Sequence, residues 1–237
     1  MKLNVRMLGR IVALSVAGVL PASASTLTYN FGQVSGGTAP AGSPPWLQAV
    51  FTDNGLPANT INLTLSAGNL SGGDFVTCWY FNVNPALNPT GLSFTVSSSS
   101  GSFAGPSIQT AANGFKAGPD GKFDLLFGFT STGDNSTRFT SGDSLTLTIS
   151  GISGLTVNDF SALSTSAGGN GAYPSAARVV SGSQVPDIDW INPVSTLRQN
   201  GDRTPAVPDG ATTSVLLGVS LVAIEGLRRK MQIRSAR

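Results

Sequence analysis

The side chains that carry most enzyme chemistry are scarce in this chain. It has no histidine, a single cysteine, Cys78, and a single glutamate, Glu225, so carboxylate chemistry falls to eleven aspartates. Ser-His-Asp and Cys-His arrangements need an imidazole, and a zinc site needs several Cys or His ligands. A glycosidase pair would have to be built from two aspartates. We therefore expect a noncatalytic protein.

Two pairs of aspartates lie close in sequence, Asp120 with Asp124 and Asp187 with Asp189. Asp120 and Asp124 flank a predicted turn, and no feature of either pair separates a general acid from a general base. Calcium is the one cofactor worth considering, because hard cations take oxygen ligands from loops. The loop aspartates that would supply them are Asp120, Asp124, Asp134 and Asp143. Turn aspartates commonly only form turns, so we predict no cofactor.

Cys78 lies in the apolar run Phe75–Phe81, and a single cysteine allows no intrachain disulfide. No basic residue is near it in sequence, and a reactive thiol needs an electropositive, accessible setting. We expect a buried, inert thiol.

Aromatic side chains offer a binding chemistry instead. Trp46, Trp79 and Trp190 can stack on sugar rings if they are exposed in a row; packing in the core is the alternative. Trp79 and Tyr80 are neighbours, and neighbours on a strand point to opposite faces. We expect only one of these two to be exposed.

The charge distribution argues against nucleic acid as a partner. Between Ser25 and Gly210 there are six basic residues and eleven aspartates, a net charge of −5. Binding to phosphates requires clustered Lys and Arg. Most other basic residues crowd the two ends of the chain.

Residues 1–24 have the pattern of a secretory signal peptide. Three basic residues precede the apolar run Ile11–Leu20, which Pro21 ends. Small residues at Ala22 and Ala24 suit a signal peptidase, so we predict cleavage between Ala24 and Ser25 after export through the Sec translocon.

The other end combines a short motif, an apolar stretch and a basic cluster. Val207, Pro208, Asp209 and Gly210 precede the stretch 211–227, which is followed by Arg228, Arg229 and Lys230. A helix over 211–227 would be about 25 Å long, a marginal membrane span. The basic cluster holds the C-terminus on the cytoplasmic side of the inner membrane.

This arrangement resembles the PEP-CTERM sorting signals of Gram-negative bacteria, in the variant that begins Val-Pro-Asp-Ser-Gly. The resemblance covers roughly residues 207–231. It implies that an exosortase-like enzyme cuts near the motif and moves the body to the cell surface or extracellular matrix. A plain membrane anchor without processing is the alternative.

Between the ends, hydrophobic residues recur with period two, as in half-buried antiparallel strands. The alternating runs are Leu27–Phe31, Ile61–Leu65, Leu92–Val96 and Leu145–Ile149. Phe75–Val83 and Phe123–Phe129 are denser and predict central strands, and Trp46–Thr52 and Leu155–Phe160 are further strand candidates. Turns are expected at Asn54-Gly55, Asn113-Gly114 and Asp120-Gly121. We expect Ser97–Gly105 to form a loop.

The chain is thus predicted to be all-β, an antiparallel sandwich or jelly-roll-like body of seven to nine strands flanked by a signal helix and a membrane helix. Its divisions are a signal peptide (1–24), the body (25–192), a flexible stalk (193–206) and the sorting signal (207–237). We expect a structural or adhesive body, with an exopolysaccharide-binding module as the alternative. An enzyme would instead show a pocket of convergent aspartates.

Overall fold

The computed structural model describes residues 24–167, 169, 172–182 and 188–194. Within them the body is all-β, which confirms the predicted fold class. The strands are β1 (Thr26–Gly36), β2 (Leu47–Thr52), β3 (Ile61–Ser66), β4 (Phe75–Phe81), β5 (Ser93–Ser100), β6 (Ser107–Lys116), β7 (Lys122–Gly128), β8 (Phe139–Thr140), β9 (Ser144–Ser150), β10 (Ser175–Val180) and β11 (Ile188–Pro193). Two short 3-10 helices, η1 (Pro89–Gly91) and η2 (Val157–Phe160), complete the described elements.

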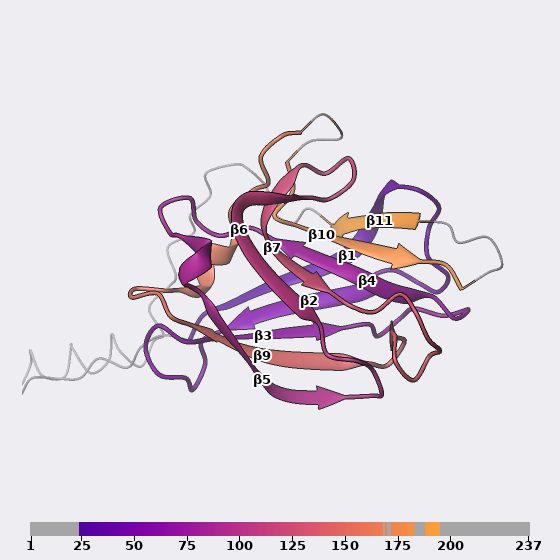
Figure 1. The fold of residues 1–237 in the computed structure, drawn as a ribbon, viewed down its shortest axis with the longest axis horizontal. Coiled ribbons are helices and arrows are strands. Elements are labelled where there is room, and N and C mark those ends of the chain that lie inside the picture. The colour runs from indigo at the N-terminus through magenta and orange to yellow at the C-terminus, as the bar shows by residue number, and fades with distance from the viewer. Residues whose placement is uncertain (1–23, 168, 170–171, 183–187, 195–237) are drawn as a thin grey trace, which may run out of the picture. The chain divides into compact units, whose positions relative to one another are not determined.

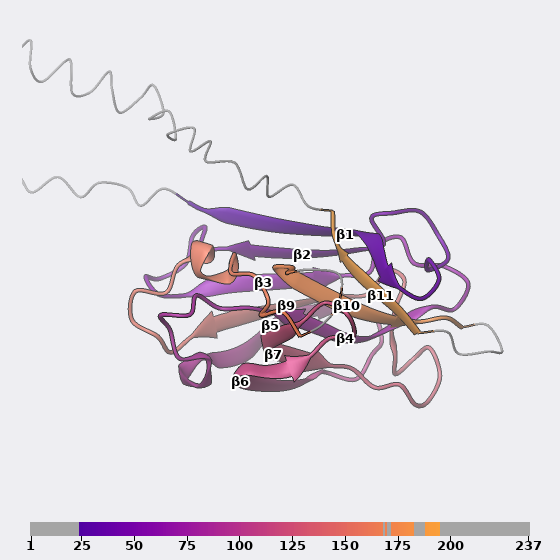
Figure 2. The same ribbon diagram turned by 90° about the horizontal axis from the view of Figure 1, so that it is seen from above.

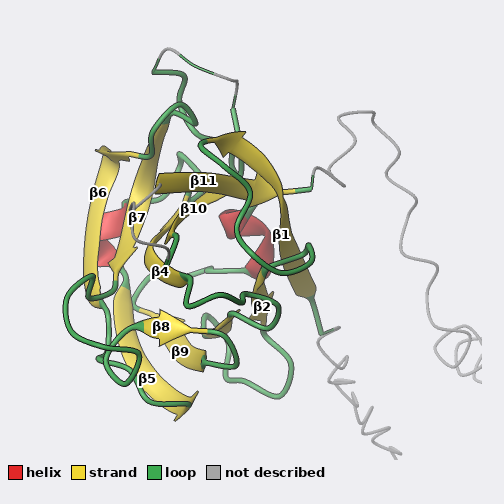
Figure 3. Ribbon diagram, turned by 90° about the vertical axis from the view of Figure 1, so that its right-hand side faces the viewer, coloured by secondary structure: helices red, strands yellow, loops and turns green. Residues whose placement is uncertain are grey.

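The strands form one antiparallel sheet that folds back on itself (Figure 1). In hydrogen-bonded order they run β5, β9, β3, β2, β1, β11, β10, β4, β7 and β6, and β8 pairs with β4. Figure 2 places β1 and β2 on one side of the body and β7 and β6 on the other. Seen from the side in Figure 3, the strands surround a common centre. The body is a nearly closed barrel of sandwich type.

Period-two alternation explains how the strands enclose a core. In β2, β3 and β9 every second residue is buried and the residues between are exposed or half-buried. The inward side chains are Leu, Ile, Phe and Ala, and they form the main hydrophobic cluster. Near one end of the strand order, the ring of Phe94 on β5 lies 5.5 Å from Phe127 on β7, so the two ends of the sheet meet across the core.

The dense runs predicted to be central strands lie in the interior of the sheet. β4 pairs with β10 on one side and with β7 and β8 on the other. Trp79, in the middle of β4, is fully buried, and its ring packs against Phe31, Phe129 and Phe139.

Three local predictions are wrong. The first four residues of the expected loop Ser97–Gly105 instead continue β5, in which Ser98–Ser100 pair with β9. Leu155–Phe160 is not a strand: a capping box between Thr156 and Asp159 starts the 3-10 helix η2 there. Asn113 has the positive φ expected of its type, 50°, but it lies in an irregular part of β6 and not in a hairpin turn.

The stretches 107–116, 175–180 and 188–193 form strands that hydrophobic periodicity did not predict. The predicted stalk begins one residue inside β11, because Pro193 pairs with Phe31 of β1. The signal peptide and the apolar stretch 211–227 lie outside the described residues. No helix within the described part of the chain has the length and hydropathy needed to cross a membrane.

Candidate functional site

The three tryptophans do not form an exposed row. Trp46 and Trp79 are buried in the main cluster, with 5% and 0% of their surfaces exposed. Trp190 lies on the outer side of β11, half-buried. Its ring lies 5.9 Å from that of Tyr80 and is covered by the backbone of Gly118. The exposed row that sugar stacking requires is therefore absent at Trp46 and Trp79, and Trp190 alone offers part of a ring to solvent.

Trp79 and Tyr80 point to opposite faces of β4 as alternation requires, yet both are buried. The expectation that one of them would be exposed is wrong because the outer face of β4 carries a second, smaller hydrophobic cluster. Its buried members are Tyr80, Ala117, Phe123 and Ala176, and half-buried apolar side chains surround them.

Cys78 lies at this outer cluster, where it is half-buried rather than buried. Arg178 of β10 is its register partner, so a cation absent from the neighbouring sequence faces it across the sheet. Burial raises the pKa of Tyr80 above its ordinary range, the nearby Cys78 thiol raises it further, and Arg178 opposes both. Cys78, Tyr80 and Arg178 thus form a small ionisable group beside Trp190.

Most described aspartates accept backbone N–H groups, either within their own turn or from another segment of the chain. Asp74 accepts backbone N–H groups from Ala41 at 2.7 Å and Gly182 at 3.0 Å, which joins two distant loops. Asp124 does the same for Val83 at 2.9 Å and Asn113 at 2.7 Å. The other described aspartates whose carboxylates accept a backbone N–H are Asp53, Asp134, Asp143, Asp159 and Asp189.

Each such bond occupies one of the roughly four acceptor positions of a carboxylate and fixes the orientation of the side chain. Asp120, Asp124, Asp134 and Asp143 each accept hydrogen bonds in separate segments of the chain. In the parts of the chain that the structure describes, no three Asp, Glu, Cys or His side chains come together as a metal site would require. Asp187, of the second predicted pair, lies outside the described residues.

Asp120 differs from the other aspartates. It is fully buried, and its Oδ2 atom accepts a hydrogen bond from the Ser35 hydroxyl at 2.8 Å. Its Oδ1 atom has no hydrogen-bond partner among the described residues. Burial raises the pKa of Asp120, and the neighbouring Asn192 and Ser35 side chains oppose that effect. Nothing in the sequence distinguishes this carboxylate from the turn aspartates around it.

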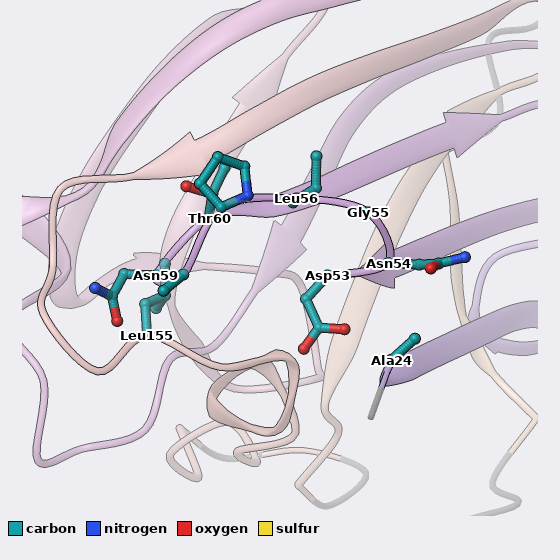
Figure 4. Close-up of a pocket in the computed structure, with 10 residues that line it drawn as sticks. Ala24, Asp53, Asn54, Gly55, Leu56, Asn59, Thr60 and Leu155 are labelled. Carbon is teal, nitrogen blue, oxygen red and sulfur yellow. The ribbon is translucent and has the colours of Figure 1, made fainter. Parts of the chain in front are cut away.

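A pocket of about 350 Å³ opens at the start of the body (Figure 4). It is lined by the turn from Asp53 to Thr60 that follows β2, together with Ala24 and Leu155. The Asp53 carboxylate accepts a hydrogen bond from the backbone N–H of Ser25 at 2.6 Å. The Ser25 carbonyl in turn accepts hydrogen bonds from the Asp53 N–H at 3.3 Å and from the Thr52 hydroxyl at 3.2 Å. Of the two residues that flank the predicted signal cleavage bond, Ser25 is held by these hydrogen bonds and Ala24 lines the pocket.

Beyond the body, residues 206–231 match the model of a C-terminal sorting signal of the PEP-CTERM type. The particular signal is the VPDSG-CTERM motif, in agreement with the resemblance carried by Val207–Gly210. The motif indicates an exported, envelope-associated protein that an exosortase-like enzyme processes. No curated protein and no solved structure matches the chain.

Sequence reasoning missed Asp53 and Asp74 as structural residues. Asp53 precedes the expected Asn54-Gly55 turn, and Asp74 follows Gly72-Gly73, where Gly72 has a φ of 67°. An aspartate beside a turn was a usable sign of backbone capping, because its short side chain reaches nearby N–H groups. The distant partners of these carboxylates had no signal in the sequence.

Proposed function

We propose that the mature protein is a noncatalytic structural or adhesive component of the cell surface or extracellular matrix. The match of residues 206–231 to the VPDSG-CTERM motif carries this proposal. The body supports it, since Asp74 and Asp124 each accept two backbone N–H groups from other segments of the chain. A carboxylate that holds two amides is poorly placed to exchange protons with a substrate.

In this proposal the chain passes through the Sec translocon and is cut between Ala24 and Ser25 by signal peptidase. The stretch 211–227 then holds it transiently in the inner membrane, with Arg228, Arg229 and Lys230 on the cytoplasmic side. An exosortase-like enzyme cuts near Val207–Gly210 and releases the body. An exopolysaccharide is the partner expected at the destination.

The test is the intact mass, with mapping of both terminal peptides, of the protein recovered from native cells and from the medium. The proposal predicts a species that starts at Ser25 and ends near Val207–Gly210. An Asp209→Ala variant should keep its tail, because it alters the sorting motif. Asp202→Ala is the matched control, since it removes a nearby aspartate outside the matched segment. A wild-type protein that retains 211–237 would contradict processing and leave a membrane-anchored protein.

A carbohydrate-binding module is the second candidate, and the half-buried ring of Trp190 beside Tyr80 is the observation that favours it. The protein would be mixed with exopolysaccharide from the same cells and sedimented with it. Loss of cosedimentation in Trp190→Ala, with retention in Trp190→Phe, would support stacking on a sugar. Unchanged cosedimentation in both variants would support the structural role.

A further inference from the structure

The contact between Ser25 and Asp53 has a chemistry that changes when the chain is cut. In the uncut chain the Ser25 nitrogen is a peptide amide, and it donates one hydrogen bond to Asp53 Oδ1 at 2.6 Å. Cleavage between Ala24 and Ser25 converts the same nitrogen to an α-ammonium group with a positive charge and additional donors. The contact thus changes from a hydrogen bond in which only the carboxylate is charged to an ion pair in which both partners are charged.

We propose that Asp53 is the internal binding site for the new amino terminus, so that export processing creates an ion pair that closes the β1–β2 corner. The proposal rests on the cleavage position given under Proposed function. It adds a binding role for Asp53 and a consequence of the cut for the folded body.

The end of the β1–β2 strand pair, where Ser25 contacts Asp53, is already arranged for this ion pair. Ser25 is held from three directions, by the Asp53 carboxylate, the Asp53 N–H and the Thr52 hydroxyl. The antiparallel pairing of β1 and β2 begins with Thr26 opposite Thr52. Ser25 and Asp53, which come next to these two residues, are therefore neighbours at the end of the strand pair. Ordering the ammonium therefore requires little further loss of backbone entropy, which is usually the main cost of such a contact.

The pocket provides the space for the additional donors. Ala24 lines it together with Asp53 and Leu155, and Figure 4 shows the Asp53 carboxylate between those two residues in that view. Removal of residues 1–24 takes Ala24 out of the wall. The ammonium then faces the pocket, where its remaining N–H groups reach water or the second carboxylate oxygen.

No other cation from this part of the chain competes for Asp53. Residues 24–115 contain no Lys or Arg, so the new ammonium is the first positive charge before Lys116. Asp159 lies on η2, which packs against β1 and β2, and its carboxylate is engaged by Thr156 and Asn84. Asp53 is thus the carboxylate that the structure shows in contact with the Ser25 nitrogen.

The pair has a defined pH dependence. An α-amino group ordinarily has a pKa of about 7.7–8.0, and a carboxylate neighbour raises it because the charged form is favoured. A basic group with a raised pKa in the folded state adds stability that is fully present below its unfolded pKa. That stability is lost as the pH rises through the folded pKa. The window therefore runs from about pH 7.5 to pH 9.5.

Four proteins test the proposal, each extending to Arg237 and purified in detergent. One begins at Ser25 and one at Ala22, and each is made with Asp53 and with Asp53→Asn. The longer chain keeps the amide hydrogen bond but moves the charge three residues away. NMR titration of Ser25 should show an ammonium pKa about one unit higher in the protein with the Asp53 carboxylate than in the Asp53→Asn variant, a tenfold change in proton affinity.

Thermal unfolding between pH 6 and pH 10 gives the second measurement. The unfolding temperature of the Ser25-first protein should fall through the stated window more steeply than that of the other three. Equal ammonium pKa values with and without the Asp53 carboxylate would overturn the proposal. These proteins are cut in vitro, so a native start at another residue would refute the cleavage position without affecting the titration.

Discussion

The two hydrophobic clusters on either side of β4 are built differently. The inner cluster packs Trp79 among phenylalanine rings, and its one buried phenol, that of Tyr29, donates to the Phe160 carbonyl at 2.8 Å. The outer cluster is small and lies beside Cys78 and Arg178. One face of the sheet therefore carries a large cluster of packed apolar side chains, whereas the other carries a small cluster that adjoins a thiol and a guanidinium group.

The largest expected difference between the clusters concerns two tryptophans. Trp79→Ala leaves a cavity among fully packed rings and should lower the free energy of unfolding by about 3–5 kcal/mol. Trp190→Ala removes a half-buried ring and should cost about 1–2 kcal/mol. Urea unfolding of both variants checks this. Equal losses would mean that the outer cluster carries as much of the stability as the core.

A smaller effect is expected from the two buried phenols. Tyr29→Phe leaves the Phe160 carbonyl without its donor inside the core, which should cost about 1–2 kcal/mol. Tyr80→Phe is the matched control on the outer face, where the hydroxyl's neighbour is the Cys78 thiol, and we expect a smaller loss. Urea unfolding again gives the measurement. A larger loss of unfolding free energy in Tyr80→Phe than in Tyr29→Phe would mean that the Tyr29 hydroxyl is not the more important of the two.

The smallest effect should appear as a pH dependence at Asp120. Burial raises its pKa, so the folded state disfavours the ionised carboxylate. This penalty is absent below the unfolded pKa of about 3.9 and grows as the pH rises through the folded pKa. Asp120→Asn should therefore gain stability relative to wild type between pH 4 and pH 7.

Unfolding curves at both pH values give that comparison. Asp74→Asn is a useful reference, because that carboxylate accepts two backbone amides and its replacement should destabilise the protein at pH 7. A gain in Asp74→Asn, or a loss at pH 7 relative to pH 4 in Asp120→Asn, would contradict the account given for these two residues.

Alternation predicted the strands that have one face on the core. Ile61–Leu65 and Leu145–Ile149 lie within β3 and β9, where large apolar side chains alternate with threonine or asparagine. β10 carried no such signal, because Ser175–Val180 consists mainly of small residues that the two clusters bury from opposite faces. β6 was missed since its outward positions are polar or small and its pairing is interrupted near Asn113.

The candidate site was less predictable than the fold. The sorting signal is a continuous segment, so the order of motif, apolar stretch and basic cluster along the sequence carried the prediction that the family model confirmed. The hydrogen bond between Ser25 and Asp53 joins residues 28 positions apart, and no sequence spacing rule predicts it. The grouping of Cys78 with Arg178 likewise exists only because β4 and β10 are paired.

The pairing of β1 with β11 has a consequence for the order in which an exported chain folds. β1 is the first strand made and β11 the last described, yet they are adjacent, and β11 also supplies the partner of β10. Closing so long a loop is slow, and β1 and β10 keep unpaired edges until it happens. The barrel therefore cannot close until the exported chain has been delivered as far as Pro193.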